Sequence, residues 1–268
     1  MASINYRNEI EGFNEDLRLN NYSLMPIKDD EFEICKKLSE AKAQAYFGKK
    51  VKEEELKPHF IKTISILGEK TLEYYLKKGE SVGIKRYSDI NNGESIIEGN
   101  NMSQRILLTS RPLREVDLVA YCHEFGHLPT LLKPHKNEYY EYSEVFPMFL
   151  EYLADYQIEP ESIKEIMTKI RLEPTKEMAT NFLRNQKGIK NNNSYKDKYL
   201  RLDQRENMKY IRSLEFVLQL LKIYKSDRKP VIEELEKYVL SEKSMKEIGK
   251  TFGIKTEGCQ NVLRLKSK

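Results

Sequence analysis

Two histidines separated by one helical turn are the clearest chemical signal in this sequence. Residues 123–127 are His-Glu-Phe-Gly-His, and on an α-helix the side chains of His123 and His127 project from one face. Two imidazole nitrogens in that arrangement can bind the same metal ion, and the geometry suits zinc. Glu124 lies about 100° around the helix from His123. That position is poor for a metal ligand but close enough to take a proton from a water on the metal, so we interpret Glu124 as a general base.

A catalytic zinc site usually has three protein ligands and a water, so the motif needs a third ligand. After a His-Glu-x-x-His motif, this ligand is commonly a residue on a following helix. The acidic candidates downstream are Glu138, Glu141, Glu144, Glu151 and Asp155. The motif alone leaves the choice between them open.

The alternative is that the pattern arose by chance on an amphipathic helix. The chain has only 4 histidines, and two of them flank a glutamate here. Gly126 also argues against chance, because a glycine inside a helix costs about 1 kcal/mol relative to alanine and is tolerable where another backbone or a substrate must come close. We therefore favour a metal site.

The same segment resembles the zinc-binding region of a known peptidase family. The motif, followed by Glu-Val-Phe-Pro-Met-Phe-Leu-Glu-Tyr-Leu-Ala-Asp-Tyr at residues 144–156, is similar to the oligoendopeptidase F and thimet oligopeptidase family of gluzincin-type zinc metallopeptidases. The resemblance implies that Glu144 is the third ligand and that Glu151 is a carboxylate behind the ligands. Residues 105–110, a strand-like run before the motif, are similar to that family's edge strand.

Residues 144–156 also allow a second assignment of the third ligand. Glu151-Tyr-Leu-Ala-Asp155 resembles the Glu-x-x-x-Asp of other zinc peptidases, in which the glutamate is the ligand and the aspartate orients a ligand histidine. We favour Glu144 as the ligand. Glu151 or Asp155 would then orient a ligand histidine through its second ring nitrogen.

The sequence departs from the family pattern in two places. The family usually has a further histidine shortly after the motif and a longer connection to the ligand glutamate, whereas residues 128–130 are Leu-Pro-Thr here. The family's upstream histidine and tyrosine, which help to stabilise the oxyanion, have no clear counterparts. The available phenols are Tyr195, Tyr199 and Tyr210, and each could donate a hydrogen bond to a tetrahedral intermediate.

Composition and charge exclude several classes of protein. Lys and Arg number 46 against 42 Asp and Glu, so the formal net charge of +4 gives no strong case for nucleic acid or a membrane as the main partner. No apolar run approaches the length of about 20 residues that spans a membrane, and the first residues do not have the pattern of a signal peptide. The three cysteines are far apart and form no framework. We expect a cytoplasmic protein.

Apolar spacing predicts helices around a small sheet. Helical periodicity extends over residues 29–47 and 56–78 in the N-terminal part. Short extended pieces at 81–87, 95–98 and 105–109, separated by glycine and asparagine turns, predict the sheet. Further predicted helices are 161–184, broken at Pro174, then 199–225, 230–240 and 244–252, with a polar loop at 187–198. We expect His59 to be a surface or satisfied histidine and Cys122 to be a small core residue.

These patterns predict a mainly α protein with one zincin-like metallopeptidase catalytic domain over residues 1–268 and a small β-sheet at the cleft edge. The parts would be N-terminal helices (1–80), the sheet and zinc-binding helices (81–160), and C-terminal helices (161–268). By the resemblance, this is a short, catalytic-domain-only version of the family.

The predicted function is zinc-dependent hydrolysis of peptide bonds in oligopeptides or exposed segments. Zn²⁺ would be the cofactor and a peptide the substrate, with no membrane or nucleic-acid partner. One alternative is a non-catalytic, zinc-stabilised regulatory protein whose residues 244–264 form a DNA-binding segment resembling a helix-turn-helix. Another is a zinc hydrolase that attacks a different carbonyl.

Overall fold

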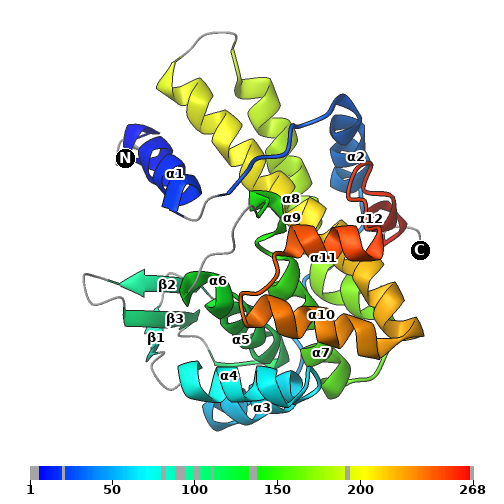
Figure 1. The fold of residues 1–268 in the computed structure, drawn as a ribbon. Coiled ribbons are helices and arrows are strands. Elements are labelled where there is room, and N and C mark those ends of the chain that lie inside the picture. Colours follow the sequence, from blue (N-terminus) through cyan, green and yellow to red (C-terminus); the bar gives the residue numbers. More distant parts are fainter. Residues whose placement is uncertain are drawn as a thin grey trace.

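The structure, a computed structural model, describes residues 6–19, 22–79, 83–87, 94–98, 103–109, 112–132, 138–190 and 194–265. The fold is mainly helical, as predicted (Figure 1). Within these residues, no helix combines the length and the apolar character needed to cross a membrane.

Four helices form the centre of the molecule. α5 (Glu115–Gly126) packs against α7 (Val145–Ile158), and α7 also contacts α8 (Ile163–Gly188) and α9 (Tyr195–Ser226). Every residue of α7 from Val145 to Asp155 is buried. A helix buried on all sides belongs to the core rather than to the surface. The two helices that carry the predicted metal ligands therefore lie in the best-packed part of the chain.

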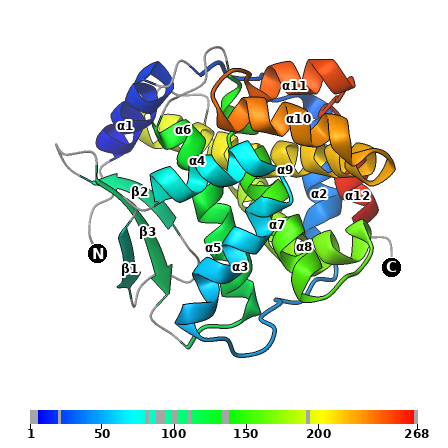
Figure 2. The same ribbon diagram turned by 60° about the horizontal axis from the view of Figure 1, so that its bottom comes forward.

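The N-terminal helices surround this centre (Figure 2). α1 (Tyr6–Leu19) packs on α9, and α2 (Asp29–Ser39) packs on α8. α3 (Leu56–Ser65) contacts both α5 and α7, while α4 (Glu69–Gly79) lies between α3 and α10 (Arg228–Val239). Among these helices, α3 packs directly on the two helices that carry the predicted ligands.

Two of the predicted N-terminal helices differ in the structure. The helix predicted over residues 29–47 stops early, because backbone hydrogen bonds join residues 47–51 to the segment 113–116 that leads into α5. The helix predicted over residues 56–78 is divided into α3 and α4 at Gly68. The φ angle of Gly68 is 99°, a conformation that residues with a side chain rarely adopt.

α8 continues through Pro174, where the sequence predicted a break. A proline inside a helix costs about 3 kcal/mol because it removes a backbone hydrogen bond. α8 packs along both α9 and α2, and the fully buried Phe182 and Ala179 lie one to two turns beyond the proline. Tertiary packing therefore keeps the helix continuous. The predicted loop over residues 187–198 overlaps the ends of α8 and α9, and its residues 191–193 lie outside the described ranges.

Three strands form a sheet beside α5. β1 (Gly83–Tyr87) pairs in parallel with β3 (Ser103–Thr109), and β2 (Glu94–Glu98) pairs antiparallel with it, so the order is β1-β3-β2. β3 is therefore central among the described strands, and the expectation that residues 105–109 form an edge strand is wrong. β2 and β3 both contact α5. The predicted turns at 91–93 and 99–101 lie outside the described residues.

The segment predicted to resemble a helix-turn-helix forms α11 (Met245–Phe252) and α12 (Gln260–Leu265). Ser244 caps the start of α11, and Gly253, in a left-handed conformation, ends it. α12 packs on α9 with Val262 and Leu265 buried. Apolar residues of this segment are part of the buried core. DNA binding by the segment stays an untested alternative.

Gly126 allows α5 and α7 to pack closely. A Cβ atom added at Gly126 would lie 2.6 Å from Cα of Pro147, which is backbone and cannot rotate away. We expect Gly126→Ala to lower the free energy of unfolding by about 1 to 3 kcal/mol through overpacking, as measured by chemical denaturation. Gly12 in α1 has no atom within 4 Å of such a Cβ, so the control Gly12→Ala should be neutral or stabilising. Equal effects of the two substitutions would contradict this role for Gly126.

Candidate metal centre

Three side-chain atoms converge where α5 meets α7. The Nε2 atoms of His123 and His127 lie 3.3 Å apart, and Oε2 of Glu144 lies 3.2 Å from the first and 3.5 Å from the second. These three residues form a cluster whose geometry could hold a metal ion. The structure thus brings together the two histidines of the motif and the glutamate that the sequence favoured.

Helix ends position all three side chains. α5 begins at Glu115, and the Asp117 carboxylate accepts the backbone N–H of Arg114 at 2.6 Å. His123 lies in the last turn of α5. His127 is the residue after the helix, but its φ of −76° and ψ of −15° continue the helical path. Glu144 is the N-cap residue of α7.

The donor set fits a zinc ion. Oε2 of Glu144 is buried and accepts no hydrogen bond, so an anionic oxygen faces two ring nitrogens with no proton donor assigned to it. Such an arrangement is costly without a cation. Tetrahedral zinc with ligand bonds of about 2.0–2.1 Å places its ligand atoms about 3.3 Å apart, close to the three distances found here.

Glu151 and Arg171 orient His123. Oε1 of Glu151 lies 2.7 Å from Nδ1 of His123. Nη2 of Arg171 lies 3.2 Å from the same nitrogen. Nδ1 of His123 therefore faces both an acceptor, the Glu151 carboxylate, and a donor, the Arg171 guanidinium, so these contacts orient the ring without fixing its tautomer. Arg171 on α8 holds Glu151 with two hydrogen bonds, one of them from Nε to Oε2 at 2.5 Å. Glu151 thus lies behind the histidine rather than in the cluster.

Lys209 on α9 contacts the other oxygen of Glu144. Its Nζ lies 3.0 Å from Oε1 of Glu144 and 3.2 Å from Oε2 of Glu206. Burial alone would raise the pKa of Glu144, but the positive charge of Lys209 and the two histidines hold it well below its ordinary value. Burial would likewise lower the pKa of Lys209, yet the neighbouring Glu144 keeps it well above its usual range. Both groups are therefore charged at neutral pH.

Glu124 is buried on α5 beside the ligand histidine, with 7% of its surface exposed. Burial lowers the pKa of the nearby Arg171, and the negative charges of Glu144 and Glu124 act in the opposite direction, to raise it. Glu124 is not among the atoms of the metal cluster. Its role as a general base stays a prediction.

The remaining acidic candidates have other partners. Asp155, predicted as one of two residues that could orient a histidine, instead lies 3.4 Å from Nζ of Lys169, and its burial raises its pKa to about 6. Glu141 accepts the backbone N–H of Met25 at 3.1 Å. Glu138 accepts two N–H groups at the start of α11, from Met245 at 2.5 Å and Lys246 at 3.0 Å. Burial raises the pKa of Glu138 to about 7.

Of the three candidate phenols, Tyr210 lies near the cluster. The negative charge of Glu144 is the main reason that the pKa of Tyr210 rises to about 12. Tyr195 is 53% exposed, and the ring centre of Tyr199 lies 4.9 Å from that of Tyr6. At 1.5 Å per residue, Tyr199 and Tyr210 are separated by about 16 Å along α9, so the two cannot serve one site.

His59 and Cys122 were expected to be a satisfied or surface histidine and a small core residue. Nε2 of His59 lies 3.1 Å from the carbonyl oxygen of Ala154, and burial lowers the pKa of His59. Cys122 is fully buried, and its pKa is raised to about 12.

Sequence reasoning missed Arg171 and Lys209. One signal was available: Lys209, Arg212 and Glu215 recur at three-residue spacing within the apolar face of α9, and all three are buried. Charged residues on a core-facing stripe need partners of opposite charge. Their partners come from distant segments, so the spacing could have suggested buried ion pairs but not their location.

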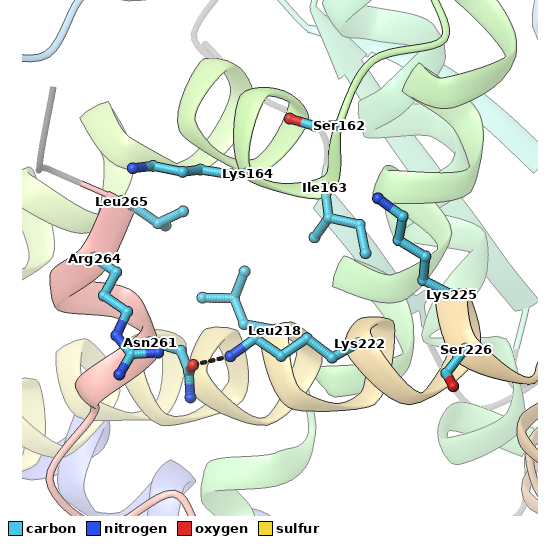
Figure 3. Close-up of a pocket in the computed structure, with 10 residues that line it drawn as sticks. All are labelled: Ser162, Ile163, Lys164, Leu218, Lys222, Lys225, Ser226, Asn261, Arg264 and Leu265. Carbon is cyan, nitrogen blue, oxygen red and sulfur yellow. Dashed lines mark hydrogen bonds between the residues drawn. The ribbon is translucent and has the colours of Figure 1, made fainter.

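A pocket of about 550 Å³ lies apart from this cluster, between the start of α8, the end of α9 and α12 (Figure 3). Ile163, Leu218 and Leu265 are apolar residues of its lining, and Lys222 bonds to Asn261 at its edge. None of the residues of the metal cluster lines this pocket. It adds nothing to the chemistry of the histidines.

No protein-family model matches the sequence, and no curated protein is similar to it in sequence. Three solved structures are similar in fold. A protein described as an oligoendopeptidase F, from Bacillus anthracis strain Ames, has a TM-score of 0.52 and 13% identity, over 96% of this chain and 55% of that one. PZ peptidase A, solved with an inhibitor, has a TM-score of 0.53 and 11% identity, over 95% and 57%.

A second structure described as an oligoendopeptidase F has a TM-score of 0.52 and 11% identity, over 97% of this chain and 55% of that one. The chain therefore spans a little over half the length of these solved proteins. At such low identity the similarity concerns the fold alone, and it covers nearly all of the present chain. The chain has the mainly helical fold found in oligoendopeptidase F and PZ peptidase structures.

Proposed function

We propose that this protein is a zinc-dependent peptidase that hydrolyses peptide bonds in oligopeptides or exposed segments. The observation that carries the proposal is the convergence of His123, His127 and Glu144, with Glu124 beside them on α5. The similarity in fold to peptidase structures supports the same reaction class. The fold alone would be a weak argument, because one fold can host many functions.

His123, His127 and Glu144 would hold the ion. When bound, Zn²⁺ supplies a Lewis acid that polarises the scissile carbonyl and lowers the pKa of water. Nδ1 of His123 would donate to Glu151, itself held by Arg171, and Nε2 would then be the nitrogen that binds the ion. These contacts would hold the ring of His123 in place before a substrate binds.

Glu124 would move the protons. It takes a proton from the attacking water and later donates it to the leaving amine. Tyr210 is the phenol that we propose as hydrogen-bond donor to the oxyanion, because its ring centre lies 4.9 Å from Nζ of Lys209, which contacts Glu144. The β-sheet next to α5 would border the substrate cleft, with substrate backbone pairing along an outer strand, β1 or β2.

The test is hydrolysis of a mixed oligopeptide library, followed by mass spectrometry, with protein purified without added metal. We expect cleavage that is lost after treatment with a zinc chelator and restored by adding Zn²⁺ to the dialysed protein. Matched ester and amide substrates without a peptide bond test the alternative that the site attacks another carbonyl. Folded, zinc-loaded protein that cleaves no peptide in the library would contradict the proposal.

A further inference from the structure

Two carboxylates at the candidate centre, those of Glu144 and Glu151, are each shared between a histidine and a buried cation. Glu144 directs Oε2 at the two histidines and Oε1 at Lys209. Glu151 directs Oε1 at His123, and Arg171 binds both of its oxygens. The two cations come from α9 and α8, helices that carry none of the clustered ligands.

Lys209 is held firmly in this position. Its side chain is 11% exposed, and its Nζ contacts the carboxylates of Glu144 and Glu206. The ammonium also lies over two aromatic rings, 5.0 Å from the centre of Tyr140 and 4.9 Å from that of Tyr210. Contacts of this kind stabilise a desolvated cation. The ammonium therefore has little freedom to leave Oε1 of Glu144.

A carboxylate ligand can bind a metal with one oxygen or with both. With both, Glu144 would take up space needed for a fourth, exchangeable ligand, which a catalytic zinc site keeps open. The ammonium of Lys209, paired with Oε1 at 3.0 Å, places a positive charge beside that oxygen and so competes with the metal for it. Oε2, which accepts no hydrogen bond, is left as the oxygen that faces the histidines.

We propose that Lys209 is a positioning residue that restricts Glu144 to one metal-binding oxygen and so keeps a coordination position open for water or substrate. This inference rests on the proposed zinc site. Loss of a merely structural cation would weaken both metal binding and activity. The proposal instead predicts that loss of Lys209 lowers activity without weakening metal binding. Without Lys209, Oε1 is released to the metal, so the metal should be held at least as tightly while the open position is lost.

The experiment compares wild type, Lys209→Met and Lys209→Arg as full chains loaded with Co²⁺ in place of Zn²⁺. We expect wild type to show the intense visible absorption of four-coordinate Co²⁺, and Lys209→Met to show the weaker bands of a higher coordination number. Competition with a chromophoric chelator should give Lys209→Met a metal dissociation constant equal to or below that of wild type. Peptide hydrolysis should fall by about 10- to 100-fold. Lys209→Arg keeps the cation and should retain the wild-type spectrum.

Weaker metal binding in Lys209→Met with an unchanged spectrum would overturn the inference, since that is the result of simple structural damage. If the methionine variant does not fold, Lys209→Gln, which also lacks the charge, carries the same prediction. Folded wild type that binds neither Co²⁺ nor Zn²⁺ would overturn both the proposed function and this inference. Wild type that binds and hydrolyses normally, with variants that match it, would overturn this inference alone.

Discussion

Glu124→Gln is expected to lower the rate of peptide hydrolysis by about 10²- to 10⁴-fold while leaving the zinc content unchanged. The amide has nearly the same shape as the carboxylate but cannot take a proton from water. Metal binding should survive because the clustered ligand atoms belong to His123, His127 and Glu144. The measurements are initial rates on a peptide identified in the library and zinc per chain by atomic emission.

The matched control is Glu177→Gln, which makes the same chemical change at an exposed position of α8. It should leave both the rate and the zinc content unchanged. A Glu124→Gln variant that keeps full activity would remove the general base from the proposed reaction. A protein in which wild type and variant both bind zinc and neither hydrolyses a peptide would instead favour the zinc-stabilised regulatory alternative.

The part of the site that could be predicted from sequence is the part that depends on helix geometry. His123 and His127 are one turn apart, so their convergence follows from the period of the helix. The close approach inferred from Gly126 is also found, with the backbone of Pro147 as the neighbour. The position of Glu144 depends on the crossing of two helices, and the residues alone left five acidic candidates for it.

The parts that could not be predicted depend on contacts between distant segments. Arg171 and Lys209 reach the site from α8 and α9. The spacing of Lys209 within the apolar face of α9 indicates burial but does not name its partner. Pro174 is a local helix breaker that packing against α2 and α9 overrides. Residues 40–47 have helical spacing but lead into backbone pairing with the segment before α5. In each case tertiary contacts outweigh a weak local preference.

The two candidates for the third ligand, Glu144 and Glu151, lead to different predictions for metal binding. Glu144→Ala should abolish zinc binding at micromolar metal, because it removes one of the three clustered ligand atoms. Glu151→Ala should weaken zinc affinity by about 10- to 100-fold and still permit full loading at saturating metal, because it removes only the acceptor that orients His123. Affinities are measured by competition with a chelator, and folding is checked by circular dichroism.

Asp155→Asn provides the control for this comparison, since Asp155 pairs with Lys169 and not with a histidine. Its zinc affinity should equal that of wild type, although the loss of a buried ion pair should lower stability. The reverse pattern, with zinc lost in Glu151→Ala and kept in Glu144→Ala, would make Glu151 the third ligand. That outcome would require Arg171 to release Glu151 and the ring of His123 to turn its Nε2, which now faces Glu144, toward Glu151. The arrangement in which Glu144 already faces both Nε2 atoms needs neither movement, and it is for this reason that we place the ligand at the start of α7.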